Sequence, residues 1–336
     1  MRKKWNRGKR TLVGTLFIWG FVFSLTMTVS AQDIKPFKLT LAMASVGGAH
    51  HAISEGLGES LRRCAPGSRV TIMPGDIAGN NVAVHNREVD LAVGFAPMTL
   101  LANMGQEPFK TPMRDLRGIM ALNPMYYTPN GTQKAGISSF EDIKTKKTPL
   151  TAVVNRRSTL QEIITREVLK AYGITYEDIA SWGGKIHFMT GGEARALLAD
   201  GHIQFMLGSV SAVPEPRLIE TSATQPMMIL EVRKDIREMI EKKYGLKEAI
   251  IPKASYKFMT KDIHTFEIAN ILYCSEALPV DTVYNLTKCF DKSRLFLARV
   301  HSAIKDLTPE TMSDIKGVPL HEGAKKYYRE IGVKVP

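Results

Sequence analysis

The chain has 336 residues, of which 44% are hydrophobic and 23% charged, as in an ordinary globular protein of about two domains. The formal net charge is +12, but six basic and no acidic residues lie in the first ten positions, which leaves 39 basic against 33 acidic residues, or +6, for the rest. Because this remaining charge is spread out, with no Arg/Lys stripe interleaved with aromatic residues, nucleic-acid binding is not expected.

The first 31 residues have the three parts of a secretory signal peptide. The basic residues precede an apolar segment from Thr11 to Val29, and the segment ends in the small residues Val29-Ser30-Ala31. The sequence therefore predicts a signal peptide over residues 1–31, a mature protein that begins at Gln32, and a periplasmic location. The apolar segment is also long enough to span a membrane, so an uncleaved anchor is the alternative.

From Leu39 onward the chain repeats a unit of strand and helix, which is typical of an α/β fold. In the first unit, an apolar strand over residues 39–44 is followed by the turn Gly47-Gly48 and a helix with apolar residues at helical spacing up to Cys64. The glycines permit a tight turn and close backbone approach, and the free amides that open the helix attract anions. Further strands are expected over 70–73 and 90–95, further helices near Gly79 and Pro97, and an extended stretch that could cross between domains over 116–127.

The same unit recurs from a strand over residues 150–154. The loop that follows leads into a helix, for which Ser158 with Gln161 and Thr159 with Glu162 form overlapping capping boxes. Thr190 with Glu193 forms another. Further strands are expected over 185–189, 203–207, 226–232 and 265–273, a connection over 250–256, and helices after Ser209-Val210-Ser211, over 234–243, within 281–304, at 308–310 and over 322–331.

The three cysteines are Cys64, Cys274 and Cys289. An oxidising compartment permits disulfides, and an odd count leaves at least one thiol over. A bond between Cys274 and Cys289 is possible, but the interpretation that the sequence favours is three buried thiols.

The order of several motifs resembles one family. Residues 80–92, with Asn80-Asn81 and Arg87-Glu88-Val89-Asp90-Leu91-Ala92, resemble its segment "Ser/Asn-Asn … Gly-Glu-Ala-Asp-Leu". Residues 200–205 resemble "Asp-Gly-x-Ile-Asp-Ala", and residues 251–256 resemble "Ile-Pro-x-x-x-Tyr". The most specific match is residues 321–330, which resemble "His-Pro-Gly-Ala-x-x-Tyr-Tyr-x-Glu". Over nearly all of its mature length, the chain resembles the TAXI group of extracytoplasmic solute receptors, the TRAP-associated immunogenic proteins.

This resemblance implies an α/β, type II periplasmic binding protein with two α/β domains around a cleft. Domain I would comprise residues 32–125 and 252–336, and domain II residues 126–251. The chain would be the extracytoplasmic solute-binding subunit of a TRAP transporter. It would bind a small carboxylate, such as a dicarboxylate or glutamate, and deliver it to the membrane subunits, with no catalytic activity and no cofactor.

Arg156 and Arg157 stand where this family usually has a Gly-Ser-Gly-Thr turn. Two guanidinium groups beside a helix start can hold a carboxylate bidentately, although either could instead pair with a surface acid. His50 could bind the ligand by hydrogen bonding. Asn80, Ser158 and Thr159 could contact the ligand or only cap helices. The full set of expected ligand-binding residues is Gly47, Gly48, His50, Asn80, Tyr126, Arg156, Arg157, Ser158, Thr159, Ser209 and Tyr256, of which the tyrosines could also be core residues.

The sequence offers little support for a metal site or for an enzyme. His51 and Glu55 share a helix face and could mimic a metal pair, but no further ligand cluster is evident, so no metal is expected. No nucleophile elbow, His-Glu-x-x-His motif or phosphate loop is present, so an enzyme is not expected. The alternative functions are a secreted ligand-sensing or surface protein of the same fold and, as the weaker one, an uncharacterised hydrolase.

Overall fold

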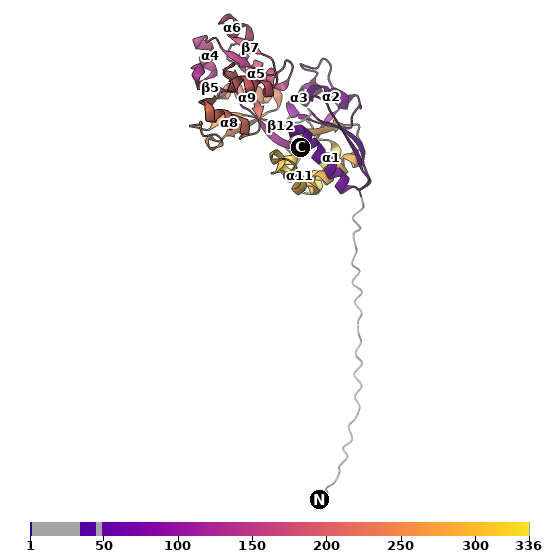
Figure 1. Ribbon diagram of the computed structural model, residues 1–336. Coiled ribbons are helices and arrows are strands. Elements are labelled where there is room, and N and C mark those ends of the chain that lie inside the picture. The colour runs from indigo at the N-terminus through magenta and orange to yellow at the C-terminus, as the bar shows by residue number, and fades with distance from the viewer. Residues whose placement is uncertain (2–33, 45–48, 336) are drawn as a thin grey trace. The chain divides into compact units, whose positions relative to one another are not determined.

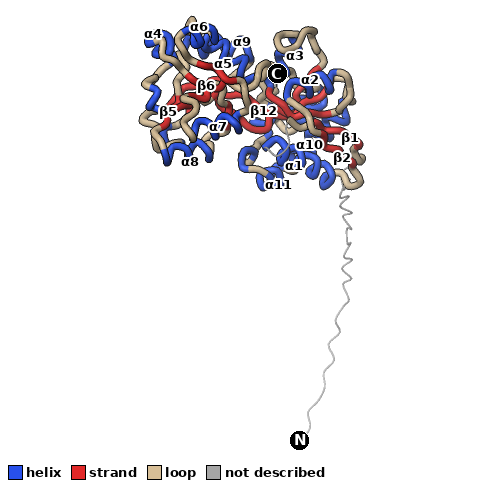
Figure 2. The backbone as a smooth tube through the Cα atoms, turned by 45° about the horizontal axis from the view of Figure 1, so that its top comes forward, coloured by secondary structure: helices blue, strands red, loops and turns tan. Residues whose placement is uncertain are grey.

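Two β-sheets, each accompanied by helices, make up the part of the chain that the computed structural model describes, which is Met1, residues 34–44 and residues 49–335 (Figure 1). The proposed signal peptide and the turn Gly47-Gly48 lie outside the described residues. Figure 2 shows the strands as two groups with helices around them. The expected α/β class is confirmed.

The first sheet has seven strands and takes them from both ends of the chain. Its order is β2-β1-β3-β12-β4-β9, and β11 also pairs with β12. β1 pairs in parallel with β2 and β3, whereas β12 runs antiparallel to β3 and β4. The strands are β1 Lys38–Ala42, β2 Arg69–Met73, β3 Leu91–Phe95, β4 Leu116–Tyr127, β9 Val210–Ser211, β11 Lys247–Ile251 and β12 Ile263–Ser275. The accompanying helices are α1 Ala49–Cys64, α2 Ile77–His85, α3 Ala96–Met104, α10 Val280–Lys292, α11 Arg294–Val300, α12 Pro309–Ser313 and α13 Glu322–Glu330.

The second sheet has five strands, all drawn from the middle of the chain. Its order is β10-β5-β8-β6-β7, and β6 pairs in parallel with both β7 and β8. The strands are β5 Asn130–Thr132, β6 Thr151–Val153, β7 Lys185–His187, β8 Phe205–Met206 and β10 Met227–Ile229. The helices are α4 Phe140–Lys146, α5 Leu160–Ala171, α6 Tyr176–Ser181, α7 Gly191–Ala199, α8 Pro216–Thr224 and α9 Lys234–Tyr244.

The two longest strands, β4 and β12, lie side by side in the first sheet. Their pairing shifts register between Ala269 and Ile271, so Asn270 occupies an irregular position in the ladder. At the far end of the pair, Tyr127 stacks on Phe266 with ring centroids 5.1 Å apart, and both rings are buried. One hydrophobic core includes these rings together with Leu150, Leu160 and other side chains of the second sheet and its helices. A separate core lies under α1, α10 and α13.

Three expected elements differ from the structure. α2 begins at Ile77 rather than near Gly79, because the Asp76 carboxylate accepts hydrogen bonds from the N–H groups of Ala78 and Gly79 at 3.0 and 2.9 Å and so caps the helix earlier. Ser209 does not itself open a helix: residues 210–211 form β9, which pairs with β4, and the expected helix begins only at Pro216, as α8 Pro216–Thr224. Residues 247–251, partly expected as a connection, form β11 against β12.

The expectation of three free thiols is wrong. α1 packs against α10, and Cys64 at the end of α1 forms a disulfide with Cys289 of α10, with 5.6 Å between their Cα atoms. The two cysteines are 225 positions apart in the sequence, so only the fold brings them together. Cys274, in β12, is the buried free thiol. None of the helices in the described part of the chain is long and apolar enough to cross a lipid bilayer.

Candidate functional site

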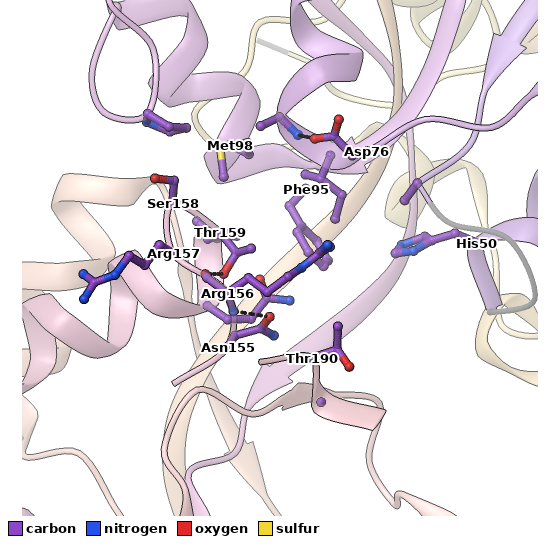
Figure 3. Close-up of a pocket in the computed structure, with 17 residues that line it drawn as sticks. His50, Asp76, Phe95, Met98, Asn155, Arg156, Arg157, Ser158, Thr159 and Thr190 are labelled. Carbon is purple, nitrogen blue, oxygen red and sulfur yellow. Dashed lines mark hydrogen bonds between the residues drawn. The ribbon is translucent and has the colours of Figure 1, made fainter. Parts of the chain in front are cut away.

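A pocket of about 700 Å³ lies at the carboxyl ends of two sets of parallel strands, β1 to β3 in the first sheet and β6 and β7 in the second (Figure 3). Each of these strands is followed by a helix whose first residues face the pocket. In α/β folds, ligands bind outside the carboxyl ends of the strands. The lining residues are Ala44, His50, Asp76, Ile77, Ala78, Phe95, Met98, Pro108, Asn155, Arg156, Arg157, Ser158, Thr159, Leu160, Gln161, Thr190 and Gly191.

Five helices, α1, α2, α3, α5 and α7, begin at this pocket, and their caps leave several amides unused. Thr159 accepts from the Glu162 N–H, and Thr190 accepts from the Glu193 N–H, which satisfies one donor in each first turn. The N–H groups of Leu160, Gln161 and Gly191 donate to no described residue. Aligned amides and the positive end of each helix dipole favour a negative group, so the lining is suited to an anion.

The two arginines of the loop take different directions. In Figure 3 the Arg156 side chain extends across the pocket toward the side where His50 lies, whereas Arg157 points away from the other lining residues. The Arg157 guanidinium stacks over the Phe188 ring, 3.8 Å from its centroid. The prediction that at least one arginine faces the cleft therefore concerns Arg156.

Arg156 forms no ion pair with any residue that the structure describes. The acid in its electrostatic range is Glu193, but both the N–H and the hydroxyl of Thr190 already donate to that carboxylate. These bonds, and to a smaller extent the charge of Arg156, hold the pKa of Glu193 below its usual value. The Arg156 guanidinium therefore borders the pocket without a paired carboxylate among the described residues.

The loop that carries Arg156 has an unusual backbone. Asn155 and Ser158 adopt positive φ angles of 78° and 62°, a conformation that glycine reaches without strain and that asparagine tolerates better than serine. The Asn155 Oδ1 accepts from the Arg156 N–H at 2.8 Å, and the Thr159 hydroxyl donates to the Arg156 carbonyl at 2.7 Å. The turn therefore keeps a glycine-like shape while it presents a charged side chain.

His50, at the start of α1, closes the opposite side of the pocket. Its Nε2 lies 2.9 Å from the Asn270 Oδ1, and its ring meets Phe95 edge-on with centroids 5.8 Å apart. Burial lowers the pKa of His50, although the hydrogen bond with Asn270 works in the opposite direction. Burial thus favours the neutral form of the imidazole.

Five of the expected ligand-binding residues line this pocket together: His50, Arg156, Arg157, Ser158 and Thr159. Thr159 also caps α5 and Ser158 does not, so of the two overlapping capping boxes only the second contains the cap. Gly47 and Gly48 lie outside the described residues.

Four other expected residues do not line the pocket. The buried Asn80 amide donates to the Met43 and Val93 carbonyls at 3.2 and 3.3 Å and so ties the end of β1 to β3. Tyr126 is half-buried in β4, and burial together with Glu267 raises the pKa of its hydroxyl. Ser209 is buried against Thr128, with 3.1 Å between their hydroxyl oxygens. The Tyr256 hydroxyl accepts from the Glu215 N–H at 2.8 Å, at the start of α8.

The residues that the sequence did not single out are mostly the other helix starts. No capping box marks Asp76, but an Asp directly before a helical run is a usable signal for an N-cap. Thr190 and Gly191 belong to the capping box that the sequence did indicate, yet nothing in the pattern assigned them to a pocket. Phe95 and Met98 are apolar residues of β3 and α3 with no distinguishing pattern.

Within the part of the chain that the structure describes, no three His, Cys, Asp or Glu side chains are grouped so that they could hold a metal ion. His51 and Glu55 lie on one face of α1, with 3.9 Å between Nε2 and Oε1.

The comparison with known proteins gives a family and a fold. The model of the NMT1-like family matches residues 41–332. The structure of PhnD1 from Prochlorococcus marinus in complex with methylphosphonate is similar with a TM-score of 0.52 at 10% identity, over 88% of this chain and 96% of that one. A structure described as a periplasmic transporter is similar with a TM-score of 0.50 at 12% identity, over 90% of this chain and 94% of that one. The fold is thus that of periplasmic binding proteins.

Proposed function

The chain belongs to the NMT1-like family, and on that premise we propose that it is the extracytoplasmic solute-binding subunit of a TRAP transporter of the TAXI group. In this role it binds a small carboxylate in the pocket described above and delivers it to the membrane subunits. The motifs at residues 200–205, 251–256 and 321–330 support the TAXI assignment.

The main support for the proposal is that a guanidinium without an ion-pair partner and several unused backbone amides lie at the same pocket. Arg156 and the N–H groups of Leu160, Gln161 and Gly191 all border one pocket of about 700 Å³, a volume suited to a small molecule. A neutral sugar would desolvate the guanidinium without pairing it, which is costly. A carboxylate offers two coplanar oxygens that match a guanidinium bidentately, and further lone pairs for the amides.

The disulfide between Cys64 and Cys289 supports a location outside the cytoplasm. Disulfides form and persist in oxidising compartments and are rare in the cytosol. Together with the basic and apolar segments of residues 1–31, this favours a periplasmic protein exported with a cleaved signal peptide.

We further propose that residues 32–125 with 252–336, and residues 126–251, act as two domains that close on the ligand. Among the contacts between these two parts is the exposed ion pair between Glu107 and Arg166 of α5, at 2.9 Å, and exposed pairs of this kind contribute little stability, so it would not oppose such a movement. We expect small-angle scattering to show a smaller radius of gyration when a bound carboxylate saturates the protein. An unchanged radius at saturation would argue for a rigid receptor.

The proposed ligand class is tested by thermal unfolding against a matched panel of carboxylates, sulfonates, phosphonates and neutral sugars. A carboxylate present at a hundred times its dissociation constant should raise the free energy of unfolding by about 2.7 kcal/mol. If a sulfonate or phosphonate stabilises the protein and no carboxylate does, the ligand is an anion but not a carboxylate. Stabilisation by a sugar alone would overturn both the carboxylate assignment and the anion site.

A further inference from the structure

We propose that His50 makes this pocket select a carboxylate that also carries a hydrogen-bond donor, a hydroxyl or ammonium group, over the same acid without one. The proposal presupposes that the pocket binds carboxylates. In addition to the carboxylate, the ligand would then need a hydrogen-bond donor, and His50 would be the residue that accepts from it.

A chain of three hydrogen bonds fixes which nitrogen of His50 carries the proton. The Asn123 amide nitrogen donates to the Pro124 carbonyl at 3.4 Å, which leaves the Asn123 Oδ1 as an acceptor. The Asn270 amide nitrogen donates to that oxygen at 3.2 Å, which leaves the Asn270 Oδ1 as an acceptor as well. The His50 Nε2, 2.9 Å from this last oxygen, must then be the donor. Neutral His50 therefore has its proton on Nε2 and a lone pair on Nδ1.

The Nδ1 lone pair has no partner among the described residues. His50 lines the pocket, and the hydrogen bond with Asn270 uses its Nε2 and not its Nδ1. In Figure 3 the imidazole projects into the pocket from the side opposite the loop of Arg156. A ligand whose carboxylate is held by Arg156 would thus meet an acceptor at the other end.

Alternatively, His50 could be protonated and bind a second negative group of the ligand. Its neighbours disfavour this protonated form. The ring is packed edge-on against Phe95, and burial lowers its pKa. The one carboxylate among the lining residues, Asp76, has one oxygen engaged by the Ala78 and Gly79 amides and another with no hydrogen bond to a described residue. Asp76 is thus a second acceptor, which disfavours a second negative group and favours a donor.

Matched pairs of acids isolate the effect of the donor. Calorimetric titrations would compare lactate with propionate, malate with succinate, and glutamate with glutarate, since each pair differs by one hydroxyl or ammonium group. For at least one pair we expect the donor-bearing acid to bind at least tenfold more tightly to the parent protein. That difference combines one hydrogen bond gained with one acceptor left unpaired.

The variant His50→Phe removes the acceptor but keeps an aromatic ring against Phe95. We expect it to bring the affinity ratio of that pair closer to one, while the acid without the donor keeps its affinity to within threefold. The same substitution one position along, His51→Phe, is the matched control and should leave the ratio unchanged. If His50→Phe also leaves the ratio unchanged, His50 does not read the donor.

A second measurement does not depend on any ligand. Nitrogen-15 chemical shifts of the histidine side chains should show His50 protonated on Nε2 with a free lone pair on Nδ1 at neutral pH. A proton on Nδ1 would overturn the proposal. If both acids of every pair bind with equal affinity, the proposal fails while carboxylate binding stands. If none of the six acids binds, both the proposed function and this inference are wrong.

Discussion

Replacing Arg156 with alanine is expected to weaken the binding of the tightest carboxylate at least thirtyfold, whereas Arg157→Ala should change it less than threefold. Removing one partner of a desolvated, hydrogen-bonded charge pair costs about 2–5 kcal/mol, and 2 kcal/mol corresponds to about thirtyfold. Arg156 projects into the pocket and forms no ion pair with a described residue, so the bound carboxylate would be its partner. Arg157 already stacks on Phe188 and points away.

Calorimetric titration of both variants measures this difference, and their melting temperatures show whether folding is intact. The variant Arg156→Lys refines the result, because lysine keeps the charge but cannot pair bidentately, so its affinity should fall between those of the parent and Arg156→Ala. Equal losses in the Arg156→Ala and Arg157→Ala variants would mean that general positive charge, rather than one directed guanidinium, attracts the ligand. No loss in either would assign the anion to the backbone amides alone.

Removing the bond between Cys64 and Cys289 is expected to lower the free energy of unfolding by about 2–5 kcal/mol. The bond closes a loop that spans 225 sequence positions, and a cross-link over so long a loop restricts the unfolded chain strongly. The double variant Cys64→Ala with Cys289→Ala, compared with the parent by urea unfolding, gives the value. Carboxylate affinity should not change, because Cys64 lies ~21 Å along α1 from His50 at 1.5 Å per residue.

Reductant supplies the control for this comparison. It should lower the stability of the parent and leave the double variant unaffected, since the remaining Cys274 has no partner. A thiol reagent should find one free thiol in the denatured, unreduced parent. Three free thiols, or equal stability of parent and variant, would show that the bond does not form.

The features that the sequence predicted best are those with a local cause. The extended stretch over 116–127 is confirmed as β4. The Thr159 cap, which accepts from the Glu162 N–H, marks the start of α5, and the capping box of Thr190 with Glu193 marks the start of α7. Each depends on neighbours within a few residues, since strand character follows from β-branched and apolar composition and a capping box from one hydroxyl and one carboxylate. For the same reason, the sequence predicts the series of strand and helix units but not which strands pair in each sheet.

Features set by distant partners could not be predicted. The two-residue strand β9 exists because it pairs with β4 and because the hydroxyls of Ser209 and Ser211 both lie 3.1 Å from that of Thr128. The disulfide depends on the packing of α1 against α10, which no spacing of cysteines shows. Sequence reasoning could not assign a direction to either arginine of the loop, because the ring that holds Arg157 belongs to Phe188, beyond the intervening helices α5 and α6.

The pocket shows the same difference between features with a local cause and features set by distant partners. His50, Arg156 and Thr159 were expected near a ligand because they stand beside helix starts, and they border one cavity. Asn80 and Tyr256 stand in similar local patterns, yet their polar groups bond to backbone carbonyls and to a backbone amide elsewhere in the fold. Local sequence places a polar residue at the end of an element, but only the arrangement of the elements decides what that residue faces.

The central claim is that Arg156 and the amides of α5 and α7 hold the anionic group of a small ligand, and a crystal structure of the complex with the most stabilising carboxylate tests it most directly. We predict that carboxylate oxygens lie within about 3 Å of the Arg156 guanidinium and of at least one N–H group among Leu160, Gln161 and Gly191. A carboxylate bound in this pocket without contact to Arg156, or bound elsewhere on the protein, would contradict the claim.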